Sequence, residues 1–128
     1  MKIAVLEDNP AIVGYMTTAL QLAGYQVETY TQAVSLFEAL FTQGGIHHPL
    51  PYDALTVDLL LPGGISGLEV ITRIRRLIPP QNLPIIVISG AGESLLEQVK
   101  TTFPDVPILI KPFKMRKLLE VFDALKRS

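Results

Sequence analysis

The chain has 128 residues, a usual length for one domain, with 48% hydrophobic and 18% charged residues, which indicates a globular protein with a core. A net charge of −1 excludes a basic surface for nucleic acid. The absence of cysteine excludes disulfides and thiolate metal sites. No run of about 18 apolar residues could span a membrane, and the N-terminus becomes acidic too soon for a signal peptide. We therefore expect one cytoplasmic domain over residues 1–128 that binds neither nucleic acid nor membrane.

Strand and helix patterns alternate in the first half of the chain. Residues 3–6 form a short apolar run that predicts a buried strand, and residues 26–29 predict a second, weaker strand. Between them, Asn9 can cap a helix that has Pro10 at its first position and ends at Gly24. The next apolar residues follow helical spacing: Ala33, Leu36, Phe37, Leu40 and Phe41. A Gly- and Pro-containing stretch, residues 44–51, then predicts a loop.

Three further strands and three helices are expected in the second half. The strands are predicted at residues 54–57, 85–88 and 107–110. One helix spans residues 67–77, with Arg73, Arg75 and Arg76 mostly outward. Another is outlined by apolar residues that we expect in the core: Leu95, Leu96, Val99 and Phe103. The last helix buries Met115, Leu118, Leu119, Phe122 and Leu125 and exposes Lys114, Lys117, Glu120, Asp123, Lys126 and Arg127.

Five strands that alternate with five helices predict an α/β fold with a parallel sheet and helices on both faces. The strands are apolar without period-two alternation, which favours a parallel sheet over an antiparallel one.

Polar side chains stand where four of these strands end. Glu7 and Asp8 follow the first strand, Asp58 the third, Ser89 the fourth and Lys111 the fifth. Because ligands of open parallel sheets bind at the carboxyl ends of the strands, we expect these residues to converge on one edge.

Three carboxylates so placed repel one another, at roughly 4 kcal/mol for each pair 4 Å apart at an effective dielectric of about 20. One lysine cannot offset this, whereas a divalent cation that prefers oxygen ligands can, and Mg²⁺ is the usual one for phosphoryl chemistry. We expect Glu7 and Asp8 to hold Mg²⁺, with Asp58 both a ligand and a nucleophile towards phosphorus. Ser89 and Lys111 would contact the phosphoryl oxygens.

The whole chain resembles the receiver domain of bacterial two-component response regulators. The resemblance is carried by Leu6-Glu7-Asp8, Asp58 to Pro62, Ile88-Ser89-Gly90 and Lys111-Pro112-Phe113. It implies a flavodoxin-like (βα)5 fold, with phosphotransfer to Asp58 from a phosphohistidine of a sensor histidine kinase or a histidine phosphotransfer protein. It also implies Mg²⁺ with the backbone carbonyl of Leu60 as a further ligand, and a cis Lys111–Pro112 bond.

The same resemblance implies how such a domain signals. Phosphorylation would change the binding of an effector protein, whose identity is open, through the surface of the fourth helix, fifth strand and fifth helix. The chain would catalyse only its own phosphorylation and dephosphorylation, so it would not be an enzyme in the usual sense. We expect a monomer or weak dimer, acting alone, as a phosphorelay shuttle or as part of a longer protein.

Several residues depart from the family pattern. Glu7 stands where Asp is commoner, which lengthens its reach and favours metal coordination through water. The loop after Asp58 has one extra residue at Gly63-Gly64, and Ile108 replaces the usual aromatic of the switch. Leu60 and Ala91, two residues after Asp58 and Ser89, are apolar where the family positions a water, so we expect a long-lived aspartyl phosphate.

Three other functions are known for domains of this size and topology, and the residues fit each of them less well. A phosphorylation-independent receiver, acting as a protein-interaction platform, would be expected to lack Asp58 or Lys111, and this chain has both. An FMN-binding protein would need a phosphate-binding loop after the first strand, where Glu7 and Asp8 would repel phosphate. A hydrolase with an Asp nucleophile on that strand would need a second Asp two residues later, whereas the two acids here are adjacent.

Overall fold

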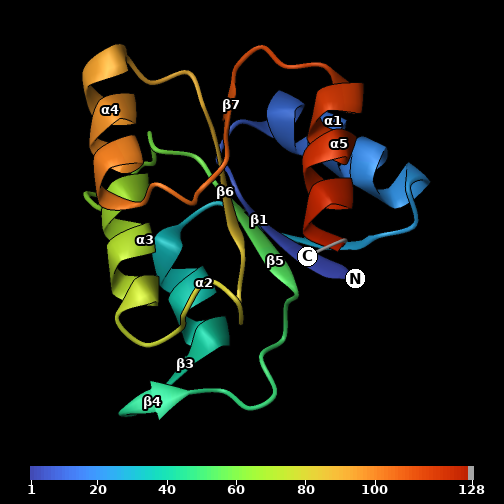
Figure 1. The fold of residues 1–128 in the computed structure, drawn as a ribbon. Coiled ribbons are helices and arrows are strands. Elements are labelled where there is room, and N and C mark those ends of the chain that lie inside the picture. Colours follow the sequence, from blue (N-terminus) through green and yellow to red (C-terminus); the bar gives the residue numbers. More distant parts are fainter. Residues whose placement is uncertain (127–128) are drawn as a thin grey trace.

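Five strands pair in parallel to form one sheet in the computed structural model, which describes residues 1–126 (Figure 1). Their order across the sheet is β2-β1-β5-β6-β7. The strands are β1 (Lys2–Leu6), β2 (Gln26–Tyr30), β5 (Ala54–Val57), β6 (Ile85–Ser89) and β7 (Ile108–Ile110). This is the doubly wound, flavodoxin-like order, in which the chain reverses direction across the sheet at β1. The predicted fold class is confirmed.

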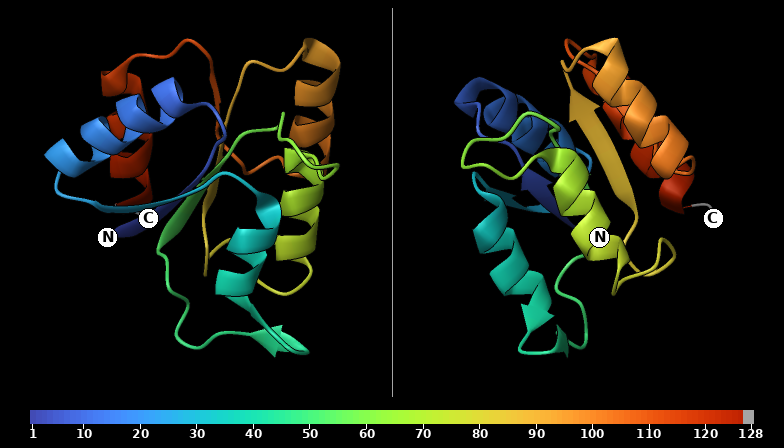
Figure 2. Two further views of the ribbon diagram at one scale, coloured as in Figure 1. Left: turned by 180° about the vertical axis from the view of Figure 1, so that it is seen from behind. Right: turned by 90° about the vertical axis from the view of Figure 1, so that its left-hand side faces the viewer.

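Helices cover both faces of the sheet (Figures 1 and 2). On one face lie α1 (Pro10–Leu22) and α5 (Met115–Lys126), and on the other α2 (Ala33–Leu40), α3 (Gly67–Arg75) and α4 (Glu93–Thr102). Successive side chains of a strand point to opposite faces, so β1 serves two cores. Ile3 and Val5 pack with α1 and α5, whereas Ala4 and Leu6 pack with α2, α3 and α4. The central strands are therefore apolar throughout.

Side-chain caps fix where two of the helices begin. Asn9 Oδ1 accepts hydrogen bonds from the amides of Ala11 (2.9 Å) and Ile12 (3.2 Å), with Pro10 at the first helical position as predicted. Ser66 Oγ accepts from the Glu69 amide at 3.2 Å and so begins α3. Each cap satisfies backbone donors that have no partner inside the helix.

The predicted loop over residues 44–51 is wrong at its start, and so is the assignment of Phe41 to a helix. α2 ends at Leu40, and β3 (Phe41–Thr42) pairs antiparallel with β4 (Gly45–Ile46). Gly44 makes the tight turn possible with a φ of 89°, which a side chain would disfavour. Phe41 still packs near Phe37, with ring centroids 5.6 Å apart, so its apolar character fits a strand as well as a helix.

α3 ends at Arg75, two residues before the predicted end, and the side chain of Arg75 does not point freely outward. It is half-buried, and Nη1 donates to the Ile78 carbonyl at 3.2 Å, so the guanidinium partners a carbonyl just beyond the helix end. The Lys, Glu and Asp residues predicted to be exposed on the last helix are exposed. Of its five predicted core residues, Leu118 and Phe122 are buried and the others half-buried. Arg127, also predicted to be exposed, lies outside the described residues.

No helix within residues 1–126 is both long and apolar enough to cross a lipid bilayer.

A polar cluster joins the edge strand β2 to the start of β1 and β5. Glu28 Oε1 lies 2.8 Å from Lys2 Nζ, and Glu28 Oε2 accepts a hydrogen bond from the Tyr52 hydroxyl. The hydrogen bond from Lys2, followed by that from Tyr52, holds the pKa of Glu28 below its ordinary value of 4.5.

Glu28→Gln should therefore remove a pH-dependent contribution to stability. A carboxyl whose pKa is lowered by folding stabilises the fold above its unfolded pKa, and this contribution is lost as pH falls through the folded value. Urea unfolding should show wild type more stable than the variant near neutral pH by less than about 1 kcal/mol, because the pair is exposed. This difference should shrink as pH falls below about 4.5. Glu97→Gln is the control: it removes a more exposed ion pair, with Lys100 at 3.6 Å, and should change stability at neutral pH less than Glu28→Gln does.

Candidate functional site

Backbone pairing carries the sheet register just past the strand ends. Leu6 is paired with Val57, and the amide of the next residue, Asp58, donates to the Leu6 carbonyl at 3.1 Å. At the other side of the sheet the Lys111 amide donates to the Ser89 carbonyl at 3.1 Å. The residues that follow neighbouring strands are thereby fixed at one edge, as predicted from the sequence.

Asp58 lies at the centre of this edge and is only 5% exposed. Its Oδ1 accepts hydrogen bonds from the Leu60 amide and from Ser89 Oγ, each at 3.1 Å. Its Oδ2 lies 2.9 Å from Lys111 Nζ. A buried carboxylate is costly unless donors and a cation face it, and here two neutral donors and one ammonium do so.

Lys111 links two buried acids. Its Nζ lies 2.5 Å from Glu7 Oε1 as well as 2.9 Å from Asp58 Oδ2. Glu7 is 2% exposed, and its Oε2 accepts from the Asn9 amide at 3.2 Å. The ammonium therefore stands between two carboxylates that would otherwise face each other without an intervening charge.

Burial and charge shift the pKa values of this pair. Burial raises the pKa of Glu7, and the charge of Asp58 raises it further, against the opposing hydrogen bonds from Lys111 and Asn9. Burial by itself lowers the pKa of Lys111, but its hydrogen bonds to Glu7 and Asp58, with their charges, outweigh this and raise it above 10.5. Lys111 consequently stays an ammonium near neutral pH.

The third predicted acid, Asp8, is exposed beside these two. Glu7, Asp8 and Asp58 each offer a carboxylate oxygen, and the three oxygens lie within 4.8 Å of one another. Such an all-oxygen set suits a hard divalent cation. The donor set on this edge therefore fits the expected Mg²⁺.

Ser89 contacts Asp58 through its side chain, whereas Leu60 contacts it through its backbone. Ser89 is fully buried; its Oγ donates to Asp58 Oδ1 and accepts from the Ala91 amide at 3.1 Å, which fixes the hydroxyl on both sides. Leu60 contributes its amide, while its side chain is 57% exposed. The Lys111–Pro112 peptide bond is cis, as the resemblance implied.

Sequence reasoning missed the part that Gly67 plays in the site. Its amide donates to the Leu59 carbonyl at 3.0 Å, which brings the start of α3 against the backbone of Asp58 and Leu59. A Cβ at Gly67 would lie 2.6 Å from Leu59 Cα and still closer to the Asp58 carbonyl oxygen. The only signal in the sequence was a glycine directly after a helix cap, and that pattern alone does not reveal a close approach.

The fold and the residues at this edge define a class of protein: a doubly wound α/β domain that carries three acids, a hydroxyl and a lysine at the carboxyl ends of its strands. The family model described as "Response regulator receiver domain" matches residues 3–123. The chain therefore belongs to the response regulator receiver family, whose members are phosphoacceptors of two-component systems.

Curated relatives agree with this assignment. The chain is 31% identical over 128 residues to the phosphate regulon transcriptional regulatory protein PhoB of Rhizobium meliloti (strain 1021), covering 98% of this chain and 52% of PhoB. It is 26% identical over 124 residues to the response regulator receiver protein CpdR of Brucella abortus (strain 2308), covering 97% of this chain and 95% of CpdR. The chain thus spans about half the length of PhoB but nearly all of CpdR.

Solved structures share the fold. A sensor protein from Polaromonas sp. JS666 superposes with a TM-score of 0.75 at 28% identity, covering 98% of this chain and 96% of that one. The receiver domain of a sensor histidine kinase from Pseudomonas aeruginosa PAO1, solved with magnesium in its active site cleft, has a TM-score of 0.80 at 22% identity. In that comparison 99% of this chain and 98% of the other are covered.

Gly67→Ala should destabilise the protein and displace Asp58. The added methyl group meets backbone rather than a movable side chain, so we expect a loss of about 1–3 kcal/mol in the free energy of unfolding by urea. Gly14→Ala in α1 is the matched control, because a Cβ there meets nothing within 4 Å. The control should gain about 0.5–1 kcal/mol from helix propensity. Equal effects of the two substitutions would contradict the close approach.

Lys111→Met should leave Glu7 and Asp58 without their shared cation. We expect a loss of about 2 kcal/mol or more at neutral pH. The loss should be smaller near pH 4, because burial raises the pKa of Glu7 above 4.5 and protonation of Glu7 relieves the repulsion. Millimolar MgCl₂ should recover more stability in this variant than in wild type, because the acids gain another cation. The measurement is urea unfolding at two pH values with and without Mg²⁺. A loss of stability that depends on neither pH nor Mg²⁺ would argue against the role of Lys111 as the cation shared by Glu7 and Asp58.

Proposed function

We propose that Asp58 accepts a phosphoryl group from a phosphohistidine of a sensor histidine kinase or a histidine phosphotransfer protein. One observation carries the proposal: a buried carboxylate at the end of the central strand β5 faces an ammonium, a hydroxyl and an amide, with two more acids alongside. Three donors around one carboxylate are also three donors for the oxygens of a phosphoryl group attached to it.

The transfer is a displacement at phosphorus. A carboxylate oxygen of Asp58 attacks, the new P–O bond forms as the P–N bond of the phosphohistidine breaks, and the imidazole nitrogen keeps the electron pair. Lys111, held at 2.9 Å from Asp58, offsets the negative charge that arrives. Ser89 and the Leu60 amide, which contact Asp58 Oδ1, can hydrogen-bond the phosphoryl oxygens. Positioning and charge neutralisation therefore account for the catalysis.

Glu7, Asp8 and Asp58, with the backbone carbonyl of Leu60, would hold Mg²⁺. When bound, Mg²⁺ supplies positive charge that offsets the carboxylates and the incoming phosphoryl oxygens. The length of Glu7 favours its contact with the ion through water.

The output of the domain follows from the surface of α4, β7 and α5, which we propose as the face whose partner binding changes on phosphorylation. Ile110 at the end of β7 is 50% exposed, and it directly precedes Lys111. Ile108 is half-buried against the core shared with α4, so an aliphatic side chain occupies the place of the switch aromatic. The chain would catalyse only its own phosphorylation and dephosphorylation. The apolar side chains of Leu60 and Ala91 cannot hydrogen-bond an attacking water, which favours a long-lived phosphoryl group.

The decisive test is intact-mass spectrometry after incubation with acetyl phosphate and Mg²⁺. Wild type should gain about 80 Da, one phosphoryl group, and Asp58→Asn should gain nothing. Asp53→Asn, five residues earlier and exposed, is the matched control and should be labelled like wild type. Omission of Mg²⁺ should reduce labelling strongly. An adduct that persists in Asp58→Asn would overturn the assignment.

A further inference from the structure

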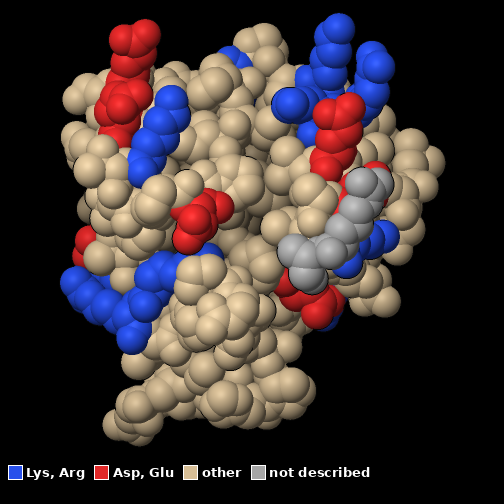
Figure 3. All heavy atoms as spheres, viewed as in Figure 1, with Lys and Arg blue, Asp and Glu red and all other residues tan. Residues whose placement is uncertain are grey.

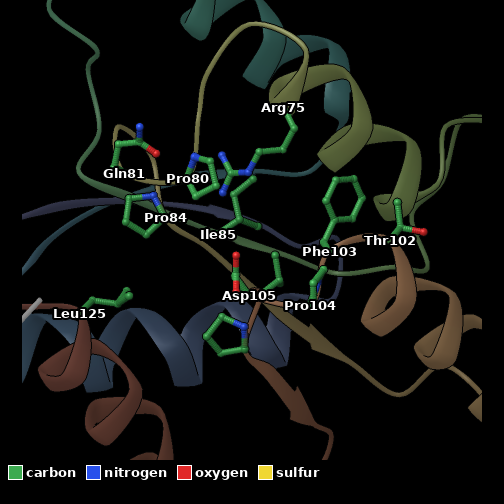
Figure 4. A pocket seen from close by; sticks show the side chains of 12 residues that line it. Arg75, Pro80, Gln81, Pro84, Ile85, Thr102, Phe103, Pro104, Asp105 and Leu125 are labelled. Carbon is green, nitrogen blue, oxygen red and sulfur yellow. The ribbon is translucent and has the colours of Figure 1, made fainter.

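A cavity of about 720 Å³ lies at the end of the sheet opposite to Asp58. It is bounded by the C-terminal ends of α3 and α4, the loops that lead into β6 and β7, and the last turns of α5 (Figure 4). The cavity shares no residue with the phosphoacceptor site. Its volume is that of an ordinary small-molecule site.

The walls of the cavity are apolar and stiff. Phe103, Pro80, Pro84, Pro104 and Pro107 all line it, and proline fixes φ and offers no amide donor. The sheet already uses two wall carbonyls: Pro84 accepts from the Leu55 amide and Pro107 from the Val87 amide, each at 2.9 Å. The walls therefore provide a preformed apolar surface, which lowers the entropic cost of binding.

Arg75 provides positive charge in this apolar setting. Its side chain runs from α3 towards Ile85, between Pro80 and Phe103 (Figure 4). Nη1 donates to the Ile78 carbonyl at 3.2 Å, but within residues 1–126 no carboxylate lies at ion-pair distance from the guanidinium. Arg73, by contrast, pairs with Glu69 at 3.0 Å. Burial lowers the pKa of Arg75, as expected for a cation that lacks compensation.

Charged residues near Arg75 affect the electrostatic potential in the cavity in two opposite ways: neighbouring arginines make it more positive, and Asp105 makes it less positive. Lys and Arg side chains gather over the C-terminal part of α3, where Arg73 and Arg76 are exposed (Figure 3). Asp105 lines the same cavity and points into it opposite Arg75 (Figure 4). One negative charge on a ligand would be attracted by Arg75, whereas a second would meet the Asp105 carboxylate.

We propose that this cavity binds a small organic monocarboxylate with an aromatic or alicyclic body. The carboxylate would pair with the free donors of Arg75, whose planar fork matches it. The body would lie against Phe103 and the prolines. Asp105 disfavours dianions such as phosphate monoesters, so the site differs in charge preference from the phosphoryl site at Asp58.

The proposal is tested by NMR titration of the ¹⁵N-labelled full chain with 2-naphthoate and with its neutral analogue 2-naphthamide. Naphthoate should shift amides of the loops before β6 and β7 and of the end of α5, with saturation in the range up to about 5 mM. Arg75→Gln should weaken naphthoate at least about tenfold and change naphthamide less than about twofold. Arg75→Lys, which keeps a charge but not the fork, should fall between Arg75→Gln and wild type.

Two controls separate this site from its neighbours. Arg76→Gln removes an exposed charge next in sequence and should weaken naphthoate binding less than about twofold, because water and salt screen that charge. Asp58→Asn should also bind as wild type does, so failure of the phosphoacceptor proposal would not affect the result. The proposal is overturned by the absence of saturable shifts, by shifts centred on Asp58 and Lys111, or by equal losses in Arg75→Gln and Arg76→Gln. Equal binding of naphthamide and naphthoate would overturn the role of Arg75.

Discussion

The contact of Lys111 with two buried acids is the interaction on which the functional edge depends. Glu7 and Asp58 are 2% and 5% exposed, and the ammonium lies 2.5 and 2.9 Å from them. Without that charge, two carboxylates would share a low-dielectric edge, and burial would favour protonation of one of them. The ammonium thereby offsets the repulsion between the two carboxylates.

The sheet supplies the geometry that makes this bridge possible. Parallel pairing places the ends of β1, β5, β6 and β7 at one edge, and the register continues through the amides of Asp58 and Lys111. Gly67 then lets α3 begin directly against the backbone of Asp58. Strand β6 runs between the two sites: Ile85 at its start lines the Arg75 cavity, and Ser89 at its end belongs to the phosphoacceptor site.

Much of this arrangement could be predicted, because it follows from local patterns. Apolar runs marked four of the five sheet strands, Asn9 marked the start of α1, and the polar residues at the ends of those four strands marked the edge. The β3–β4 hairpin was missed because its strands have two residues each, too few to show a period. The position of Arg75 was missed as well, since helical spacing places a Cβ but not the end of a long flexible side chain.

The sequence by itself determined the fold class, the five sheet strands and the identity of the acids, hydroxyl and lysine, because apolar runs, helical spacing and the polar residue that follows a strand are properties of neighbouring residues. Only the tertiary structure decided that Lys111 bridges Glu7 and Asp58, that Gly67 touches the backbone of Asp58 and Leu59, and that Arg75 lines a proline-walled cavity. These are contacts between segments distant in the chain or between side chain and backbone. Their distances depend on packing, which no local pattern records.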